Sequence, residues 1–286
     1  MPRPVALRMA EQAKILVAEA EENNLGAEAF NERWERWYTC GLCEQHYHGV
    51  VACALGWACW KTYVGRPERS WVRTNAMTNV GNGLTSAGHY EDALSVQEAE
   101  LSMMRRLGAS GYTMLVAQNN LAGTYEALGD LEKARRLKRD VYWGNLKLHG
   151  EEHGETLRAA LNYSLTLTKL KQLGEAKALL RKTIPVARRV LGDKDIFTLK
   201  MRWIYAEALS AHPGATLDDI RESVGMLEEL ERTARRVMGG AHPNVVEIED
   251  ALRAVRAGLA LRRELAEARR QVAELRRTAA DAEAAP

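Results

Sequence analysis

The sequence predicts an all-α protein built from stacked helical hairpins. Three similar stretches place Ala93, Ala134 and Ala176 at successive intervals of 41 and 42 residues, each after a short polar turn. Self-similarity of this length is typical of hairpins that cannot bury their apolar faces alone and therefore stack on one another. Runs with the composition of β-strands are few. The chain of 286 residues is long enough for one extended repeat domain with a continuous core.

Each repeat is predicted to hold two helices separated by a turn. In the second repeat, Leu121 and Tyr125 lie on one face of the first helix. The pair Gly129-Asp130 breaks this pattern, and Leu131 begins the next apolar stripe. Only small side chains fit where two antiparallel helices cross closely. Two sets of small residues recur at the repeat period, one made of Gly81, Ala122, Ser164 and Ala206 and the other of Ala93, Ala134 and Ala176.

Glycines and one insertion mark the ends of the predicted helices. The repeats end in glycines that suit a left-handed cap, at Gly108, Gly150, Gly192 and Gly239. The last of these intervals is 47 residues, so we place an insertion of about five residues at Ser210–Ala215. Thr216 is expected to cap the helix that follows, with Asp219 completing a capping box.

These repeats resemble a known family. The matching text is Asn119-Asn120-Leu121-Ala122, Tyr125, Leu131-Glu132-Lys133-Ala134 and Leu148-His149-Gly150-Glu151-Glu152-His153. It is similar to the tetratricopeptide repeat (TPR) of the kinesin-light-chain type, and the similarity covers about residues 71–245. The resemblance implies a right-handed superhelical solenoid of about four TPR units, which we bound at residues 67–245. The family binds peptides in a concave groove lined by the first helix of each hairpin.

The candidate binding residues lie on these first helices. Asn79, Asn120 and Asn162 share one position in the repeat, where an amide offers both a donor and an acceptor to a peptide backbone. Arg158 and Lys200 share another position and would favour an acidic peptide. The predicted groove comprises Asn79, Asn82, Asn120, Arg158, Asn162, Lys200 and Trp203. The alternative is that the Asn side chains only satisfy backbone groups between hairpins.

Residues 1–66 are expected to form a helical cap at the start of the solenoid. Phe30, Trp34 and Trp37 recur at helical spacing, and we expect this aromatic face to pack in the core. The stretch Val50–Trp60 is apolar nearly all round, which predicts a buried helix docked on the first repeat.

The four cysteines lie close together, at Cys40, Cys43, Cys53 and Cys59. A Cys-x-x-Cys turn such as Cys40 to Cys43 is a common half of a zinc site, because it points two thiolates at one metal ion. His46 or Cys53 would be a further ligand. We expect the four thiols to be reduced, and the interpretation that we favour over a zinc site is that Cys53 and Cys59 pack as small apolar residues.

The segment Glu35–Gly49 resembles the last zinc knuckle of a RING-CH finger. That family holds two zinc ions, and here only Cys40 and Cys43 match its ligands, because no Cys or His precedes Cys40. A finger without its other ligands cannot build the surface that holds a conjugating enzyme. We therefore expect no enzymatic activity. Ubiquitin-ligase activity would require a longer product that supplies the missing upstream ligands.

Residues 246–286 are predicted to form one long C-terminal helix with a frayed tail. Its apolar residues follow a four-three alternation, at Leu261, Leu265, Ala268, Val272, Leu275 and Ala279. Arginine pairs recur every seven residues, at Arg262-Arg263, Arg269-Arg270 and Arg276-Arg277. Two alanines within about three heptads make a weak coiled coil. We expect a capping helix and a chain that is a monomer or a weak dimer through it.

Composition and motifs exclude several classes of function. The net charge of +2 argues against nucleic acid as a partner, and the longest apolar run, Val50–Trp60, is too short to span a membrane. The start shows no secretory pattern, which favours the cytoplasm. No catalytic or cofactor-binding motif occurs, so zinc is the one cofactor considered.

The sequence thus predicts a non-catalytic adaptor whose TPR groove binds a peptide segment of a partner protein. The first alternative is the substrate-recruiting part of a RING-CH-type ubiquitin ligase. The second is a kinesin-light-chain-like cargo adaptor, although the N-terminal segment lacks the heptads of a heavy-chain-binding coiled coil.

Overall fold

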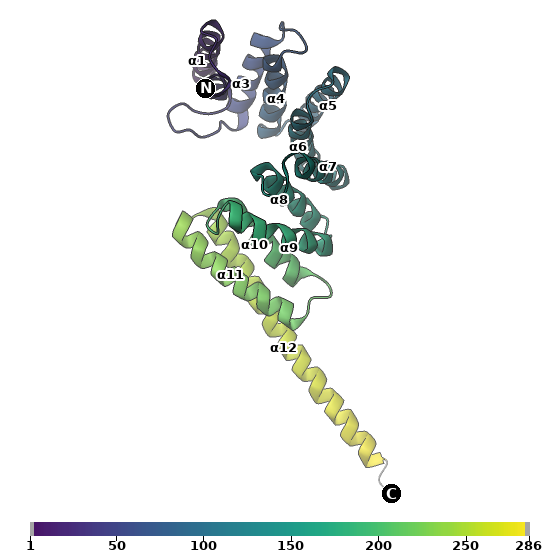
Figure 1. Ribbon diagram of the computed structural model, residues 1–286. Helices are drawn as coiled ribbons and strands as arrows, with labels where there is room; N and C mark the ends of the chain where they lie inside the picture. Colours follow the sequence, from purple (N-terminus) through teal and green to yellow (C-terminus); the bar gives the residue numbers. More distant parts are fainter. Residues whose placement is uncertain (1–2, 284–286) are drawn as a thin grey trace. The chain divides into compact units, whose positions relative to one another are not determined.

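The computed structural model describes residues 3–283, which form helices joined by turns and loops (Figure 1). No strand is present in this part of the chain; an isolated bridge pairs Thr39 with His46. The predicted all-α class is therefore confirmed.

The chain divides into two compact units, Met1–Leu148 and His149–Pro286. The first unit thus joins the expected N-terminal cap to two of the hairpins. The division into 1–66, 67–245 and 246–286 stays a prediction.

The first unit begins with three helices and a 3-10 turn and continues with two hairpins. Its elements are α1 (Arg3–Glu22), α2 (Ala27–Trp34), η1 (Glu35–Trp37), α3 (Gly49–Tyr63), α4 (Trp71–Ser86), α5 (Tyr90–Leu107), α6 (Gly111–Ala127) and α7 (Leu131–His149). Trp34 and Trp37 are buried in a cluster with α1, α3 and α4, and Phe30 packs against it. The expected role of this aromatic face in the core is therefore confirmed.

Glycines bring α3 and α4 together at backbone distance. A Cβ atom added at Gly56 of α3 would lie 2.5 Å from the carbonyl oxygen of Asn79, and one added at Gly83 of α4 would lie 2.7 Å from that of Ala52. Contacts this short leave no room for a side chain. The apolar helix α3 therefore docks directly on the first hairpin, as the sequence predicts, but it is not buried on all sides, because Val50 and Trp57 are 62% and 42% exposed.

The hairpins α4–α5 and α6–α7 cross at the predicted small residues. Ala93, Ala122 and Ala134 are completely buried. A Cβ atom at Gly81 would lie 2.8 Å from Cγ of Gln97, on the opposing helix. A larger residue at these positions would separate the two helices of a hairpin.

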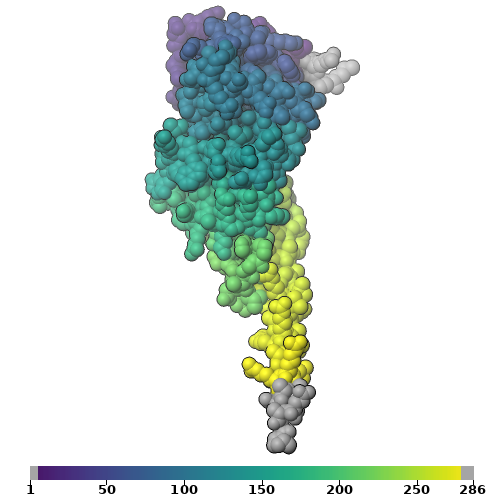
Figure 2. Space-filling view, turned by 90° about the vertical axis from the view of Figure 1, so that its right-hand side faces the viewer, coloured from purple at the N-terminus to yellow at the C-terminus, as the bar shows by residue number. Residues whose placement is uncertain are grey.

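The second unit contains two further hairpins and a long final helix. Its elements are α8 (Gly154–Lys169), α9 (Leu173–Val190), α10 (Ile196–Ala211), α11 (Leu217–Met238) and α12 (Pro243–Glu283). Val245, Ile248 and Leu252 of α12 are buried against α10 and α11. The second half of α12 extends beyond α10 and α11 (Figures 1 and 2).

The predicted capping box at the start of α11 is present. Thr216 and Asp219 form the capping box, in which the Asp219 backbone N–H donates to Thr216 Oγ1 at 3.0 Å and the Thr216 N–H donates to Asp219 Oδ2 at 2.9 Å. Gly239 follows α11 with a positive φ of 85°, which a residue with a side chain rarely adopts, but its ψ of 150° lies outside the left-handed helical region that the sequence predicts for it. Gly108 after α5 does form the predicted left-handed cap, with φ 65° and ψ 44°. Within the described residues, no helix combines the length and the hydropathy needed to cross a membrane.

Candidate peptide-binding site

In the second unit, four of the predicted groove residues lie on α8 and α10, which contact each other. Arg158 is exposed and forms an ion pair with Glu155 at 3.3 Å. Its guanidinium carbon also lies 5.5 Å from the centre of the Phe197 ring. Arg158 therefore reaches from α8 to the first turn of α10.

Lys200 follows Phe197 by three residues, so both side chains project from the same side of α10. Lys200 and Asn162 are half-buried. Together with Arg158, Lys200 supplies two cations to the face formed by α8 and α10. Asn162 lies one turn after Arg158 on α8, which places the amide and the guanidinium on one helix face.

Trp203 lines a pocket of about 310 Å³ between α10, α11 and α12. The other lining residues are Glu207, Ser210 and Ala211 of α10, Leu227 of α11, and Ala251, Ala254 and Val255 of α12. A second pocket of about 200 Å³ shares Ser210, Ala211, Ala254 and Val255 and continues to Ile220, Gly258 and Arg262. We call these two pockets the α10–α12 groove.

The groove is apolar along most of its length because small side chains on α12 face Trp203 and Leu227. Arg262 closes one end, where its guanidinium donates to the carbonyl oxygen of Ala215 at 2.8 Å. Glu207 is the acidic residue among the lining side chains. The arrangement suits an apolar side chain held between two helices, with cations nearby on α8 and α10.

In the first unit, α3 occupies the side of α4 on which Asn79 lies. The Asn79 amide donates to Sγ of Cys59 on α3 at 3.6 Å, so this Asn interacts with the cap and does not face open space. Asn82 of α4 is exposed, and Asn120 of α6 is half-buried. The three Asn residues that share one position in the repeat therefore have different surroundings, because α3 covers Asn79.

The Cys-x-x-Cys segment forms a tight exposed turn. The backbone N–H of Glu44 donates to the Cys40 carbonyl oxygen at 3.0 Å, and the Cys40 N–H donates to that of Gln45 at 2.8 Å. Hydrogen bonds from the backbone of Cys43, and then of Leu42, lower the pKa of the Cys40 thiol. The backbone from Cys40 to Gln45 thus forms a turn, as expected for a Cys-x-x-Cys segment.

Further ligands for a metal are not assembled around this turn. His46 lies before α3 rather than inside a helix, and its Nδ1 is 3.1 Å from the Thr39 hydroxyl oxygen. Burial raises the pKa of Cys53 in α3. The described residues contain no group of three or more His, Cys, Asp or Glu placed to bind one metal ion. Zinc binding at Cys40 and Cys43 stays a prediction, which the zinc content of the purified protein and of its Cys40→Ser variant would test.

The histidines between the hairpins act as helix caps. His153 Nδ1 accepts a hydrogen bond from the backbone N–H of Glu155 at 3.2 Å, and His242 Nδ1 accepts one from Asn244 at 3.2 Å. These local bonds satisfy backbone donors that a helix start leaves open.

The comparisons define the class of protein. Residues 156–196, which cover α8, α9 and the start of α10, match the family model described as tetratricopeptide repeat. The fold is similar to the crystal structure of putative kinesin light chain nearly identical TPR-like repeats of Podosopora anserina. That structure is 17% identical, with a TM-score of 0.54, and the alignment covers 82% of this chain and 98% of that chain.

A second similar structure is the apo form of RapI, at 14% identity and a TM-score of 0.50, with 78% of each chain covered. No curated protein matches the sequence. The chain therefore contains a tetratricopeptide repeat within a TPR-like, kinesin-light-chain-like repeat fold, as the sequence predicts. The RING-CH remnant stays a prediction.

The part of the site supplied by α12 was not predicted from the sequence. Ala251, Ala254 and Val255 belong to a helix that was expected only to cap the repeats. The repeat order could have indicated this role. Because α12 follows a complete hairpin, it takes the place of the first helix of a further repeat, and first helices line the groove.

Proposed function

We propose that this protein is a non-catalytic adaptor that binds a peptide segment of a partner protein along α8, α10 and α12. The observation that supports this most directly is the apolar α10–α12 groove lined by Trp203, beside the cations of the α8–α10 face. Tetratricopeptide repeats are in general scaffolds for protein–protein contacts. The four cysteines are free thiols, which fits the reducing environment of the cytoplasm.

The charges of the α8–α10 face determine where the acidic residues of a bound segment would lie. Arg158 of α8 and Lys200 of α10 attract carboxylates to the α8–α10 face, whereas Glu207 repels them from the groove. We therefore infer a segment with acidic residues against α8 and α10 and one large apolar side chain in the groove. Trp203 would be its main contact, because large aromatic residues dominate the energy of peptide interfaces.

The test is to select a random phage-displayed peptide library on the protein and to measure the enriched peptides by fluorescence polarisation. Trp203→Ala is expected to weaken binding by about tenfold or more, and Lys200→Glu by about tenfold with a weaker dependence on salt. Lys182→Glu, an exposed lysine on α9, is the matched control. Peptides whose affinity is unchanged in both groove variants would refute this site, provided circular dichroism shows that the variants are folded.

The C-terminal helix supports a second kind of contact, between two copies of the chain. Leu261 and Leu265 of α12 are 57% and 49% exposed, and Val272 is 48% exposed, so the predicted seam lies open in this structure. We infer a weak dimer through it. Sedimentation velocity should show a concentration-dependent dimer that Leu265→Glu abolishes. A monomer at all concentrations would exclude this contact.

A further inference from the structure

A pocket of about 380 Å³ lies in the first unit between α5, α6 and α7. Its apolar surface comes from the side chains of Leu101, Leu121 and Leu137, one on each helix. Leu101 and Leu121 are nearly completely buried and belong to the hydrophobic core of this hairpin region. The pocket is therefore a place where the core of the first unit opens to the surface.

Tyr125 forms one wall and is held from two sides. Its hydroxyl donates to Glu98 Oε1 at 2.5 Å, and Lys133 Nζ lies 4.9 Å from the centre of its ring. Burial, and then the hydrogen bond to Glu98, raise the pKa of Tyr125 to about 12, so the hydroxyl remains a donor. The tyrosine thus engages Glu98, which is the acidic residue among the lining side chains.

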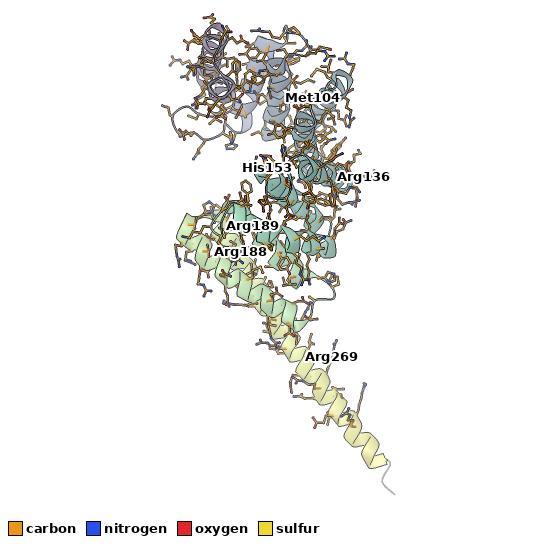
Figure 3. All side chains as sticks on the ribbon, viewed as in Figure 1. Met104, Arg136, His153, Arg188, Arg189 and Arg269 are labelled. Atoms are coloured by element: carbon orange, nitrogen blue, oxygen red, sulfur yellow. The ribbon has the colours of Figure 1, made fainter. Side chains whose placement is uncertain are left out.

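Three cations surround the apolar surface. Lys133 forms an ion pair with Asp130 at 2.9 Å. Arg105 of α5 and Arg136 of α7 are exposed, and within the described residues neither forms an ion pair (Arg136 is labelled in Figure 3). The lining therefore combines an apolar base with two exposed guanidinium groups, of which Arg136 acts on the Asp130 carboxylate only through its charge. In Figure 2 the molecule is viewed from the right-hand side of Figure 1, where α5 and α7 lie.

We propose that this pocket is a second docking site, for an acidic segment of a partner protein that inserts one large apolar side chain between α5 and α7. Carboxylates flanking this side chain would bind Arg105 and Arg136. None of the residues predicted for the groove, and none lining the α10–α12 groove, belongs to this pocket. The site is therefore independent of the function proposed above.

The size and charge of the pocket favour such an occupant. The pocket volume of about 380 Å³ accommodates a Leu, Phe or Trp side chain. It also falls within the range of ligand pockets in proteins, whose volumes start at about 300 Å³. The arginines lie on two different helices, so carboxylates on either side of the apolar residue find a partner. A guanidinium also binds a carboxylate through two parallel hydrogen bonds, which adds direction to the attraction. A basic or purely apolar segment would leave both arginines unpaired at the rim.

The test uses a random phage-displayed peptide library, selected in parallel on the wild-type protein and on the Arg105→Glu/Arg136→Glu double variant. Peptides retained only by the wild type should be rich in Asp and Glu next to Leu, Phe or Trp. Synthetic peptides of this consensus should bind each single variant about tenfold more weakly, with an affinity that falls as salt is raised. The matched control is Arg181→Glu, an exposed arginine of α9.

Two outcomes would overturn the proposal. In the first, the wild type and the double variant retain the same peptides. In the second, the selected peptides are as sensitive to Arg181→Glu as to the pocket variants. Binding to Trp203→Ala separates the two sites, because peptides of the α5–α7 pocket should be unaffected by that change. A negative result for the α5–α7 pocket would thus not refute peptide binding in the α10–α12 groove, and a negative result for the groove would not refute binding in the pocket.

Discussion

Replacing Lys138 by Met is expected to lower the free energy of unfolding by about 4 kcal/mol. Lys138 Nζ of α7 lies 2.8 Å from Glu126 Oε2 of α6, and the two side chains are only 8% and 13% exposed. Methionine is of similar length but carries no charge, so the carboxylate of Glu126 would stay buried and lose its ion pair with Lys138. Removing one member of a buried ion pair costs more stability than the intact pair contributes. Chemical denaturation at neutral pH measures the effect.

Two further variants show whether the buried charge is the cause. The double change Lys138→Met/Glu126→Leu removes both charges and should recover most of the loss, because an apolar pair can replace a buried ion pair at little cost. Arg139→Met alters the next residue on α7, whose ion pair with Asp140 is exposed, and should change stability by less than about 1 kcal/mol. If the double variant is as unstable as Lys138→Met, packing rather than charge holds α6 to α7.

The repeats could be predicted from the sequence because their determinants are local. Small residues at Ala122 and Ala134 and the capping pair Thr216 and Asp219 act within a single hairpin or turn, and each has the predicted structure. The docking of α3 was also predictable, because an apolar helix packs on a neighbour, although its exposed side at Val50 and Trp57 was not predicted. In each case the physical requirement is contained in a few neighbouring residues.

The pockets could not be predicted in this way because each depends on three helices. The α10–α12 groove requires the small residues of α12 to face Trp203, and their separation in sequence is about 50 residues. The contact between Asn79 and Cys59 could not be predicted either, because it joins two helices that the repeat period does not relate. The repeat period aligns Asn79 with Asn120 and Asn162, but it does not show that a preceding helix covers the first member of the column.

A buried carboxyl group in α5 is a further feature that the sequence pattern does not reveal. Glu100 is 1% exposed, and its carboxyl accepts a hydrogen bond from the hydroxyl of Thr78 on α4. Burial raises its pKa from 4.5 to about 7, and the hydrogen bond from Thr78 offsets only part of this shift. Between pH 4.5 and about pH 7 the folded protein therefore holds on Glu100 a proton that the unfolded chain has largely lost.

Stability should consequently fall between pH 4.5 and about pH 7. Below this window Glu100 is protonated in both the folded and the unfolded state, so its burial does not change the free energy of unfolding with pH. As pH rises through the window, the unfolded chain releases the proton first, and the free energy of unfolding falls. The fall ends when the carboxyl of the folded protein also ionises. Over the whole window the loss is about 3 kcal/mol. Glu100→Gln mimics the protonated group and should raise the free energy of unfolding at pH 8 by about this amount, with no comparable gain at pH 4.5. Denaturation curves at both pH values, with the exposed Glu222→Gln as control, provide the measurement; an equal change at both values would show that the carboxyl is not buried as a neutral acid.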